Sequence, residues 1–319
     1  KTMVITTRHI SHKEEPGISN VIPTILQIEP RNGTCTARCT MCTIDSWTRE
    51  PVQMSNETYR IILEKFVPVR EKIKEITLHG CCEPLQDRGI VGKVSIAKKL
   101  GFNESSVGFA TNLTLLTEKL SHELINAGLD CIIFSIDGFT KETHESIRVR
   151  TKFDKVVENG KRFIRIRDQL KANTRIVVRF IRQEENKLEW NEYYSFWSDL
   201  VNSEKGDKVV KFDVHNWGDT LEVYKDQDVN RGLKLDKLVC EDLFERLYIY
   251  ANGDVSFCCA DDNGFFPIGN VITENPLELY NQSYYFKYYR QMMVEGRIEC
   301  LEHCRTCTIP RSRALDRCN

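Results

Sequence analysis

Short apolar runs alternate with amphipathic stretches over the first two thirds of the chain. The apolar runs predict buried strands at 24–29, 75–79, 106–111, 131–136, 174–181 and 209–214. Apolar positions at helical spacing predict helices at 55–66, 88–100, 117–127, 154–171 and 188–201. This alternation is typical of parallel βα units, so we expect an α/β protein with either a full or partial barrel or a doubly wound sheet.

The alternating pattern stops near residue 215, and this change predicts the domain organisation. We expect an N-terminal extension over 1–20, the βα array over 21–215 and a linker over 216–239. A small, cysteine-rich α+β region is expected over 240–319, where Asn252 and Gly253 form a strong signal for a hairpin turn.

Charge and composition narrow the class of partner. The chain has 45 Lys and Arg against 46 Asp and Glu, and this balance gives no reason to expect nucleic acid or an anionic membrane as a partner. It contains no apolar run of about 18 residues and no signal-peptide pattern near its start, so we expect a cytoplasmic protein. Its 13 cysteines then indicate metal or redox chemistry rather than disulfides.

Chemistry-bearing residues follow the predicted strands, at the edge where α/β proteins place active sites. The first strand is followed by CTARCTMC, with Cys35, Cys39 and Cys42. Three thiolates can hold three irons of a [4Fe-4S] cluster and leave the fourth iron open to a small molecule. The spacing alone leaves zinc binding or plain surface cysteines equally open.

Further strand ends add to this motif. HGCCEP follows the second strand, Asn112 ends the third, and SIDG ends the fourth. With CTARCTMC, these segments resemble the radical S-adenosylmethionine (SAM) superfamily, over roughly residues 20–215. The resemblance implies a partial (β/α)6 TIM-like barrel and a [4Fe-4S] cluster whose open iron binds SAM. It also implies reductive cleavage of SAM to a 5′-deoxyadenosyl radical that abstracts a substrate hydrogen.

The resemblance also implies SAM ligands. HGCCEP resembles the family's G-G-E-P segment, whose backbone and glutamate hold the SAM amino group. The corresponding positions in this chain are Gly80 and Glu83. Cys81 and Cys82 depart from the glycine that is usual in this segment. The stretch from SIDG to Arg148 resembles the Ser and Arg pair that grips the SAM carboxylate. The expected cofactor-binding residues are Met41 (beside adenine), Gly80, Glu83, Asn112 (at the ribose, or simply a turn former), Ser135, Asp137 and Arg148.

A second metal site is predicted in the C-terminal region. Cys240, Cys258, Cys304 and Cys307 supply four thiols, a closed set that suits zinc or an iron-sulfur cluster equally. The segment resembles the SPASM extension of radical SAM enzymes or its shorter one-cluster form, called twitch. Its last cysteines do not match the spacing of the two-cluster form, so we expect one auxiliary [4Fe-4S] cluster, with three spare cysteines, Cys259, Cys300 and Cys318.

The leading hypothesis is a radical SAM oxidoreductase or epimerase that dehydrogenates or epimerises a small polyhydroxylated substrate, such as a sugar, aminocyclitol or nucleotide sugar. An electron donor such as flavodoxin or ferredoxin is then required. Candidate catalytic residues are Cys259, Cys318 and His215, the thiols as hydrogen donors and the histidine as base or substrate ligand; for each, plain packing is the simpler interpretation. One arginine of Arg175, Arg179 and Arg182 is expected either to reach a carboxylate or phosphate or to lie in solvent.

Two alternatives stay open. One is a radical SAM enzyme that epimerises or crosslinks peptides. Against it, too little chain precedes the first strand for the winged-helix leader-binding domain of many peptide-modifying relatives. The other is a non-catalytic protein that binds clusters or zinc, which the open iron of the first motif argues against.

Overall fold

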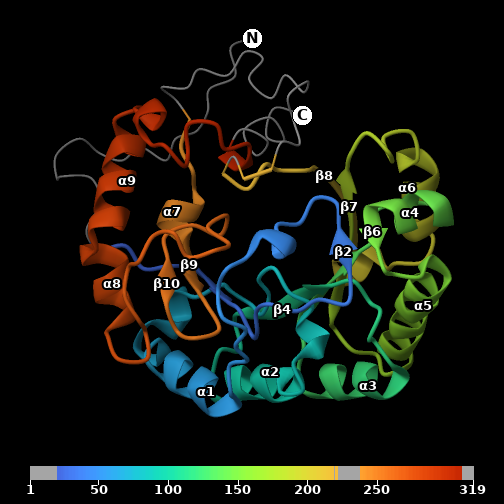
Figure 1. Ribbon diagram of the computed structural model, residues 1–319. Helices are drawn as coiled ribbons and strands as arrows, with labels where there is room; N and C mark the ends of the chain where they lie inside the picture. The colour runs from blue at the N-terminus through green and yellow to red at the C-terminus, as the bar shows by residue number, and fades with distance from the viewer. Residues whose placement is uncertain (1–19, 219, 222–237, 311–319) are drawn as a thin grey trace, which may run out of the picture.

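The computed structural model describes residues 20–218, 220–221 and 238–310 (Figure 1). Their main feature is an eight-stranded sheet in the order β10-β9-β1-β3-β4-β5-β7-β8. Neighbouring strands are parallel except β9 and β10, which are antiparallel. The strands are β1 Ile25–Ile28, β3 Glu75–Thr77, β4 Ser106–Thr111, β5 Cys131–Ser135, β7 Arg175–Arg182, β8 Lys208–Asp213, β9 Arg246–Ile249 and β10 Val255–Ser256.

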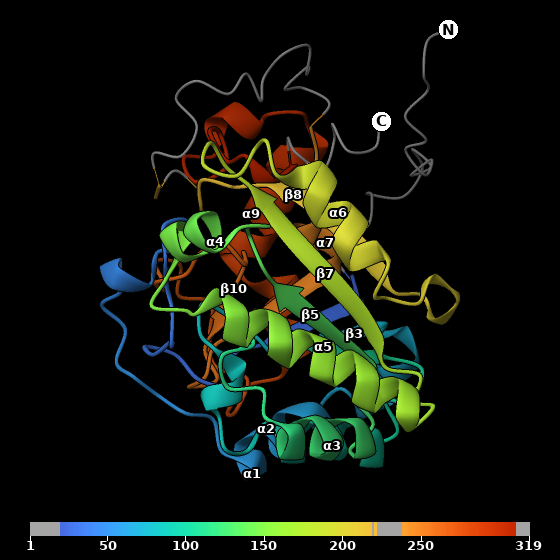
Figure 2. The same cartoon turned by 90° about the vertical axis from the view of Figure 1, so that its right-hand side faces the viewer.

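The predicted βα array is confirmed, because all six expected strands pair in their order along the chain. The expected helices also form, and Figures 1 and 2 show them along the outer face of the curved sheet. They are α1 Asn56–Glu64, α2 Ile90–Lys99, α3 Glu118–Asn126, α5 Phe153–Gln169 and α6 Trp190–Ser198. The Ser55 side chain caps α1 by accepting a hydrogen bond from the Thr58 amide, as its position predicts.

Several short elements were not predicted. They are helix α4 Lys141–Ile147, the two-residue strands β2 Arg38–Cys39 and β6 Arg148–Val149, and 3-10 turns at Ile44–Ser46, Val67–Lys72, Pro84–Gln86, Ser203–Lys205 and Ile298–Cys300. Elements of two to seven residues give too few positions for a periodic pattern, so periodicity did not indicate them.

The two faces of the sheet differ in chemistry. Residues at alternate positions, such as Leu26 and Ile28 on β1, are fully buried in the core against the outer helices. The positions between them, such as Gln27, face the inside of the curve. The sheet therefore has an apolar outer face and a partly polar inner face, which is the face that a barrel enzyme uses.

The C-terminal region continues the same sheet. Strand β9 pairs in parallel with β1, with Ile25 opposite Arg246, and the hairpin to β10 turns at Gly253, which has a φ of +89°. The predicted hairpin turn is therefore confirmed, but its attachment to β1 was not expected. Helices α7 Asp242–Glu245, α8 Pro276–Gln282 and α9 Tyr284–Val294 complete this part, with α8 and α9 on the side opposite α5 and α6 (Figure 1).

No helix in the described residues is both long enough and apolar enough to cross a membrane.

Candidate active site

The loop that carries Cys35, Cys39 and Cys42 leaves the end of β1 and is fixed by a small ladder. Strands β2 and β6 pair in antiparallel fashion, which sets Cys39 opposite Arg148. The Arg148 Nη1 lies 3.5 Å from the Cys39 sulfur. The sequence predicts that Cys39 binds a cluster and that Arg148 binds SAM, and the structure brings the two residues together.

Asp137 holds the same arginine from the other side. Its Oδ2 lies 2.7 Å from the Arg148 Nη2, and its Oδ1 accepts a hydrogen bond of 2.7 Å from the Ile181 amide. Asp137 is fully buried. The carboxylate therefore orients the guanidinium toward the cysteine loop and balances its charge away from water.

Glu83 is held by the end of the third barrel strand. Its carboxylate accepts hydrogen bonds from the Thr111 hydroxyl at 2.6 Å, the Asn112 amide at 2.8 Å and the Leu85 amide at 3.1 Å. Burial raises the pKa of Glu83, and these three donors oppose that rise. The carboxylate is thus fixed in place beside the cysteine loop, where a bound ammonium group would favour its charged form.

Asn112 and Met41 both support the cysteine loop. The Asn112 Nδ2 donates to the Thr36 hydroxyl at 2.9 Å and lies 3.7 Å from the Cys35 sulfur. The Met41 side chain packs against Ile147 and Val214, and the Gln183 amide lies 3.8 Å from its sulfur. In this structure, the contacts of both residues are to protein groups around the predicted cluster.

Gly80 lies where a side chain would not fit. A Cβ there would meet the Tyr248 hydroxyl at 2.5 Å and the Glu29 Oε1 at 2.8 Å. Glu29 forms a buried bidentate ion pair with Arg49, at 2.8 and 2.9 Å. The C-terminal region, through Tyr248, thus supports the back of the HGCCEP segment. No sequence pattern indicated this contact.

Chemically, the three thiols suit a cluster. Burial raises the pKa of Cys35 to about 12 and that of Cys39 to about 11, with Arg148 opposing the rise at Cys39. The Cys35 and Cys39 thiols are therefore protonated without a metal, and cluster binding releases their protons. The Ala37 amide, 3.4 Å from the Cys35 sulfur, is a donor of the kind that tunes cluster potentials.

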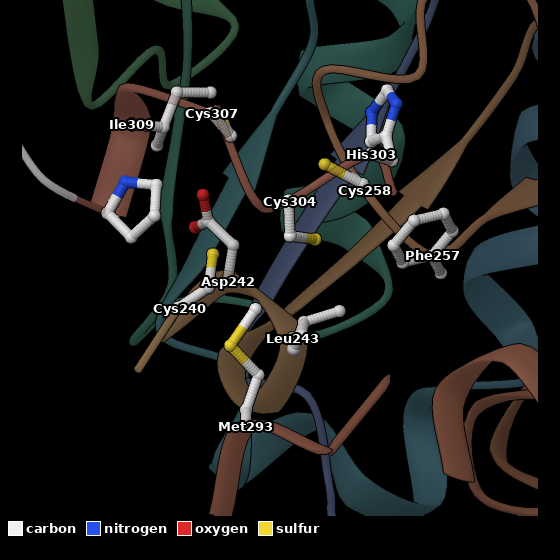
Figure 3. Close-up of a pocket in the computed structure, with 11 residues that line it drawn as sticks. Cys240, Asp242, Leu243, Phe257, Cys258, Met293, His303, Cys304, Cys307 and Ile309 are labelled. Atoms are coloured by element: carbon white, nitrogen blue, oxygen red, sulfur yellow. The ribbon is translucent and has the colours of Figure 1, made fainter. Parts of the chain in front are cut away.

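The second predicted cysteine set lines one pocket. Cys240, Cys258, Cys304 and Cys307 line the same small pocket, with Asp242 and His303 beside them. Figure 3 shows Cys240, Cys258 and Cys304 turned toward the same space. Within the described ranges, no three His, Cys, Asp or Glu side chains converge as one metal ion requires. Four thiolates at one pocket are a ligand set that an iron-sulfur cluster or zinc can take.

The remaining cysteines and His215 are placed as follows. The Cys259 thiol donates to the Asp242 Oδ2 at 3.5 Å, beside the pocket, whereas Cys300 is exposed. The His215 ring lies 4.5 Å from the Trp217 ring, in the segment that follows β8. Cys318 lies outside the described residues.

The turn at 216–218 connects the two metal sites. Asn216 exchanges hydrogen bonds with Thr308 and donates to the Thr306 carbonyl at 3.0 Å, on both sides of Cys307. The next residue, Trp217, donates from its indole to the Met41 carbonyl at 2.9 Å, between two cysteines of the first loop. Trp217 has a φ of +52°, which is costly for a large side chain and marks a conformation enforced by its surroundings.

Comparisons with known proteins agree with this arrangement. Residues 31–179 match the family model of the radical SAM superfamily, and residues 240–308 match the SPASM iron-sulfur cluster-binding domain. Among curated proteins, the chain is similar to the tungsten-containing aldehyde ferredoxin oxidoreductase cofactor-modifying protein of Pyrococcus furiosus, with 35% identity over 106 residues. That match covers 32% of this chain and 28% of the relative, less than a third of its length.

Solved structures show the same fold over most of the chain. BtrN in complex with AdoMet and 2-DOIA matches with a TM-score of 0.60 and 18% identity, covering 90% of this chain and 93% of that chain. Streptococcus suis SuiB bound to S-adenosylmethionine matches with a TM-score of 0.67 and 13% identity, covering 85% and 68%. Tagged anSMEcpe with bound AdoMet matches with a TM-score of 0.61 and 14% identity, covering 90% and 86%. The two family matches show that the chain carries a radical SAM domain over residues 31–179 and a SPASM domain over residues 240–308, and these domains imply [4Fe-4S] clusters and SAM.

Proposed function

We propose that this radical SAM enzyme removes hydrogen from a small polyhydroxylated substrate held inside the barrel, which results in dehydrogenation or epimerisation. The first cluster and SAM, when bound, supply the 5′-deoxyadenosyl radical for this step. The substrate would be a sugar, an aminocyclitol or a nucleotide sugar. The physiological reductant would be a small electron carrier such as flavodoxin or ferredoxin.

The observation that carries this proposal is the polar inner face of the sheet. Arg246 on β9 donates to the Gln27 side chain on β1 at 2.9 Å, and Gln27 donates to the His79 carbonyl at 3.1 Å. Farther along the sheet, Arg179 on β7 donates to the Ser135 hydroxyl on β5 at 2.8 Å. An interior built from such groups favours a substrate with many hydroxyl or charged groups, because it offers donors and acceptors away from bulk water.

The residues around the cysteine loop would hold SAM in this scheme. Glu83 and the backbone at Gly80 would bind its amino group, and Ser135 with Arg148 would bind its carboxylate, with Asp137 orienting the arginine. Asn112 and Met41 would then act by supporting the loop next to the ribose and adenine, consistent with their contacts to Thr36 and Ile147.

After hydrogen removal, the outcome depends on nearby groups. Cys259 is the candidate hydrogen donor for epimerisation, because its thiol is held by the Asp242 carboxylate at 3.5 Å, next to the second metal pocket. His215 is the candidate base for dehydrogenation. Cys318 stays a candidate donor from sequence alone.

The similarity to BtrN supports a small substrate, because that structure holds 2-DOIA and matches over nearly the full length of both chains. Peptide modification is the second candidate. It is favoured by SuiB, which has also been solved with precursor peptide SuiA, and by anSMEcpe, solved with the Cp18Cys peptide.

The test is a reductive SAM-cleavage assay. The protein is purified without oxygen, reconstituted with iron and sulfide, reduced in the presence of SAM, and assayed for 5′-deoxyadenosine and methionine. We expect both products, and their absence from iron-loaded protein would contradict the enzyme function. Once a substrate is found, the product formed in deuterated water separates the outcomes, because only thiol-mediated epimerisation places solvent deuterium on carbon.

A further inference from the structure

Arg179 occupies an unusual place in the barrel. It lies on β7 opposite Ser135 on β5, and its Nη2 donates to the Ser135 hydroxyl at 2.8 Å. The side chain is half-buried, and its Nε is buried without a hydrogen-bond partner in the described residues. Among the described residues, the Ser135 hydroxyl is thus the one hydrogen-bond partner of the Arg179 side chain, although the guanidinium has five donors.

The charge of Arg179 is not matched by an acid. In the part of the chain that the structure describes, Arg179 forms no ion pair, and the nearby Asp137 is already paired with Arg148 at 2.7 Å. Burial lowers the pKa of Arg179 to about 10, and the positive charge of Arg148 adds to this effect. Arg179 is still charged at neutral pH. Withdrawing a charge from water without a partner is costly, so the arrangement favours an anion that arrives with a ligand.

His79 lies near enough to both Arg179 and Arg246 to be affected by their charges. Burial, together with the positive charges of Arg179 and Arg246, lowers the pKa of His79, which follows β3, to about 3. His79 is therefore neutral, and because its Nδ1 accepts from the Ala110 amide at 3.4 Å, its Nε2 carries a hydrogen for donation. Arg246 is already held by Asp242 at 3.0 Å and by Gln27. Of the two arginines, Arg179 is thus the one without a carboxylate partner among the described residues.

We propose that Arg179 anchors an oxyanion subsite in the barrel interior, which binds a carboxylate or phosphate group of the substrate with His79 as a second donor. The guanidinium fork suits both groups, because its parallel N–H bonds match two oxygens. The proposal rests on the proposed function and narrows it. Nucleotide sugars, sugar phosphates and sugar acids carry such a group, whereas neutral sugars and aminocyclitols do not.

The test is calorimetric titration of inorganic phosphate into anaerobically reconstituted, oxidised protein saturated with SAM. We expect binding with a Kd on the order of 1 mM, because phosphate makes only part of the substrate's contacts. Arg179→Gln should weaken phosphate binding by about tenfold or more, and Arg179→Lys by less, because it keeps the charge but loses the fork. Arg182→Gln is the matched control, because Arg182 lies on the same strand and is already paired with Asp213 at 2.6 Å.

Three results would overturn the proposal. One is wild-type protein that does not bind phosphate. Another is R179Q protein that binds phosphate as tightly as wild type. If R179Q protein does not retain iron, R179K protein that binds phosphate as tightly as wild type would overturn the proposal instead. The third is an R179Q or R179K protein whose SAM affinity falls as much as its phosphate affinity, which would assign the arginine to the SAM carboxylate. Formation of 5′-deoxyadenosine by wild-type protein tests the proposed function separately, so the two failures are distinguishable.

Discussion

Arg148 faces Cys39 across a two-strand ladder, with its Nη1 3.5 Å from the cysteine sulfur and its Nη2 2.7 Å from Asp137. One side chain therefore contacts both the predicted cluster loop and the strand end that precedes α4. A substitution of Arg148 should therefore affect both the cluster site and the binding of SAM.

Replacing Arg148 by Gln should weaken SAM binding by about tenfold or more, because it removes a charged fork from the proposed carboxylate site. The measurement is equilibrium binding of SAM to reconstituted, oxidised protein, with iron content determined in parallel. Arg150→Gln is the control, because Arg150 lies two residues away and is exposed. Wild-type SAM affinity in an iron-replete R148Q protein would exclude this role.

The two cysteine sites should fill independently in an iron assay. Wild-type protein should hold about eight irons per chain, and Cys307→Ala about four, because one of two cubic clusters loses a ligand. Cys300→Ala should keep the wild-type value, because Cys300 is exposed and apart from the pocket. Equal iron contents in C307A and wild-type protein would exclude the proposed auxiliary ligand set.

His144 should make the fold sensitive to acid. Burial lowers its pKa to about 3, whereas an unfolded chain has a histidine pKa of about 6.5. Between these values the unfolded chain binds a proton that the folded chain excludes, so the free energy of unfolding falls as the pH falls. The loss is at most about 1.4 kcal/mol per pH unit, or about 2 kcal/mol from pH 6.5 to pH 5.

Urea unfolding of the metal-free protein at pH 7.5, 6.5 and 5 measures this effect. His144→Gln should lower stability at pH 7.5, because the ring packs against Phe153 at 5.5 Å, but should reduce the loss between pH 6.5 and pH 5. An unchanged pH dependence in H144Q would show that other groups control the acid response.

Gly80→Ala should destabilise the protein by about 1–3 kcal/mol, because its Cβ would lie 2.5 Å from the Tyr248 hydroxyl. Tyr248→Phe removes the clashing oxygen, so the double variant should lose less stability than the sum of the single variants. Urea unfolding of the four proteins measures this coupling. Purely additive losses would mean that the two side chains do not compete for space.

The barrel was predictable from sequence because each strand and helix has a local hydrophobic period. The cysteine motifs were equally accessible, since short loops keep ligand spacing visible in the chain. Contacts between segments that are distant in sequence were not predictable. No sequence pattern near Arg246 indicates that β9 pairs with β1. The sequence also does not distinguish Arg179 from Arg175 or Arg182, whereas the register of β5 and β7 in the structure sets Arg179 opposite Ser135. The turn at Trp217 was also hidden, because its conformation is set by Met41 and Thr306, which lie far away in sequence.

The pairing of β1 with β9 has a consequence for how the chain folds during synthesis. Among the described barrel strands, β1 is the first to leave the ribosome, but its partner on one side is made only after the whole βα array. Until then, one edge of β1 presents unpaired backbone donors and acceptors, which attract other extended chains. The C-terminal region therefore also closes the edge of an unfinished sheet, and a product that stops before Arg246 would be a source of aggregation.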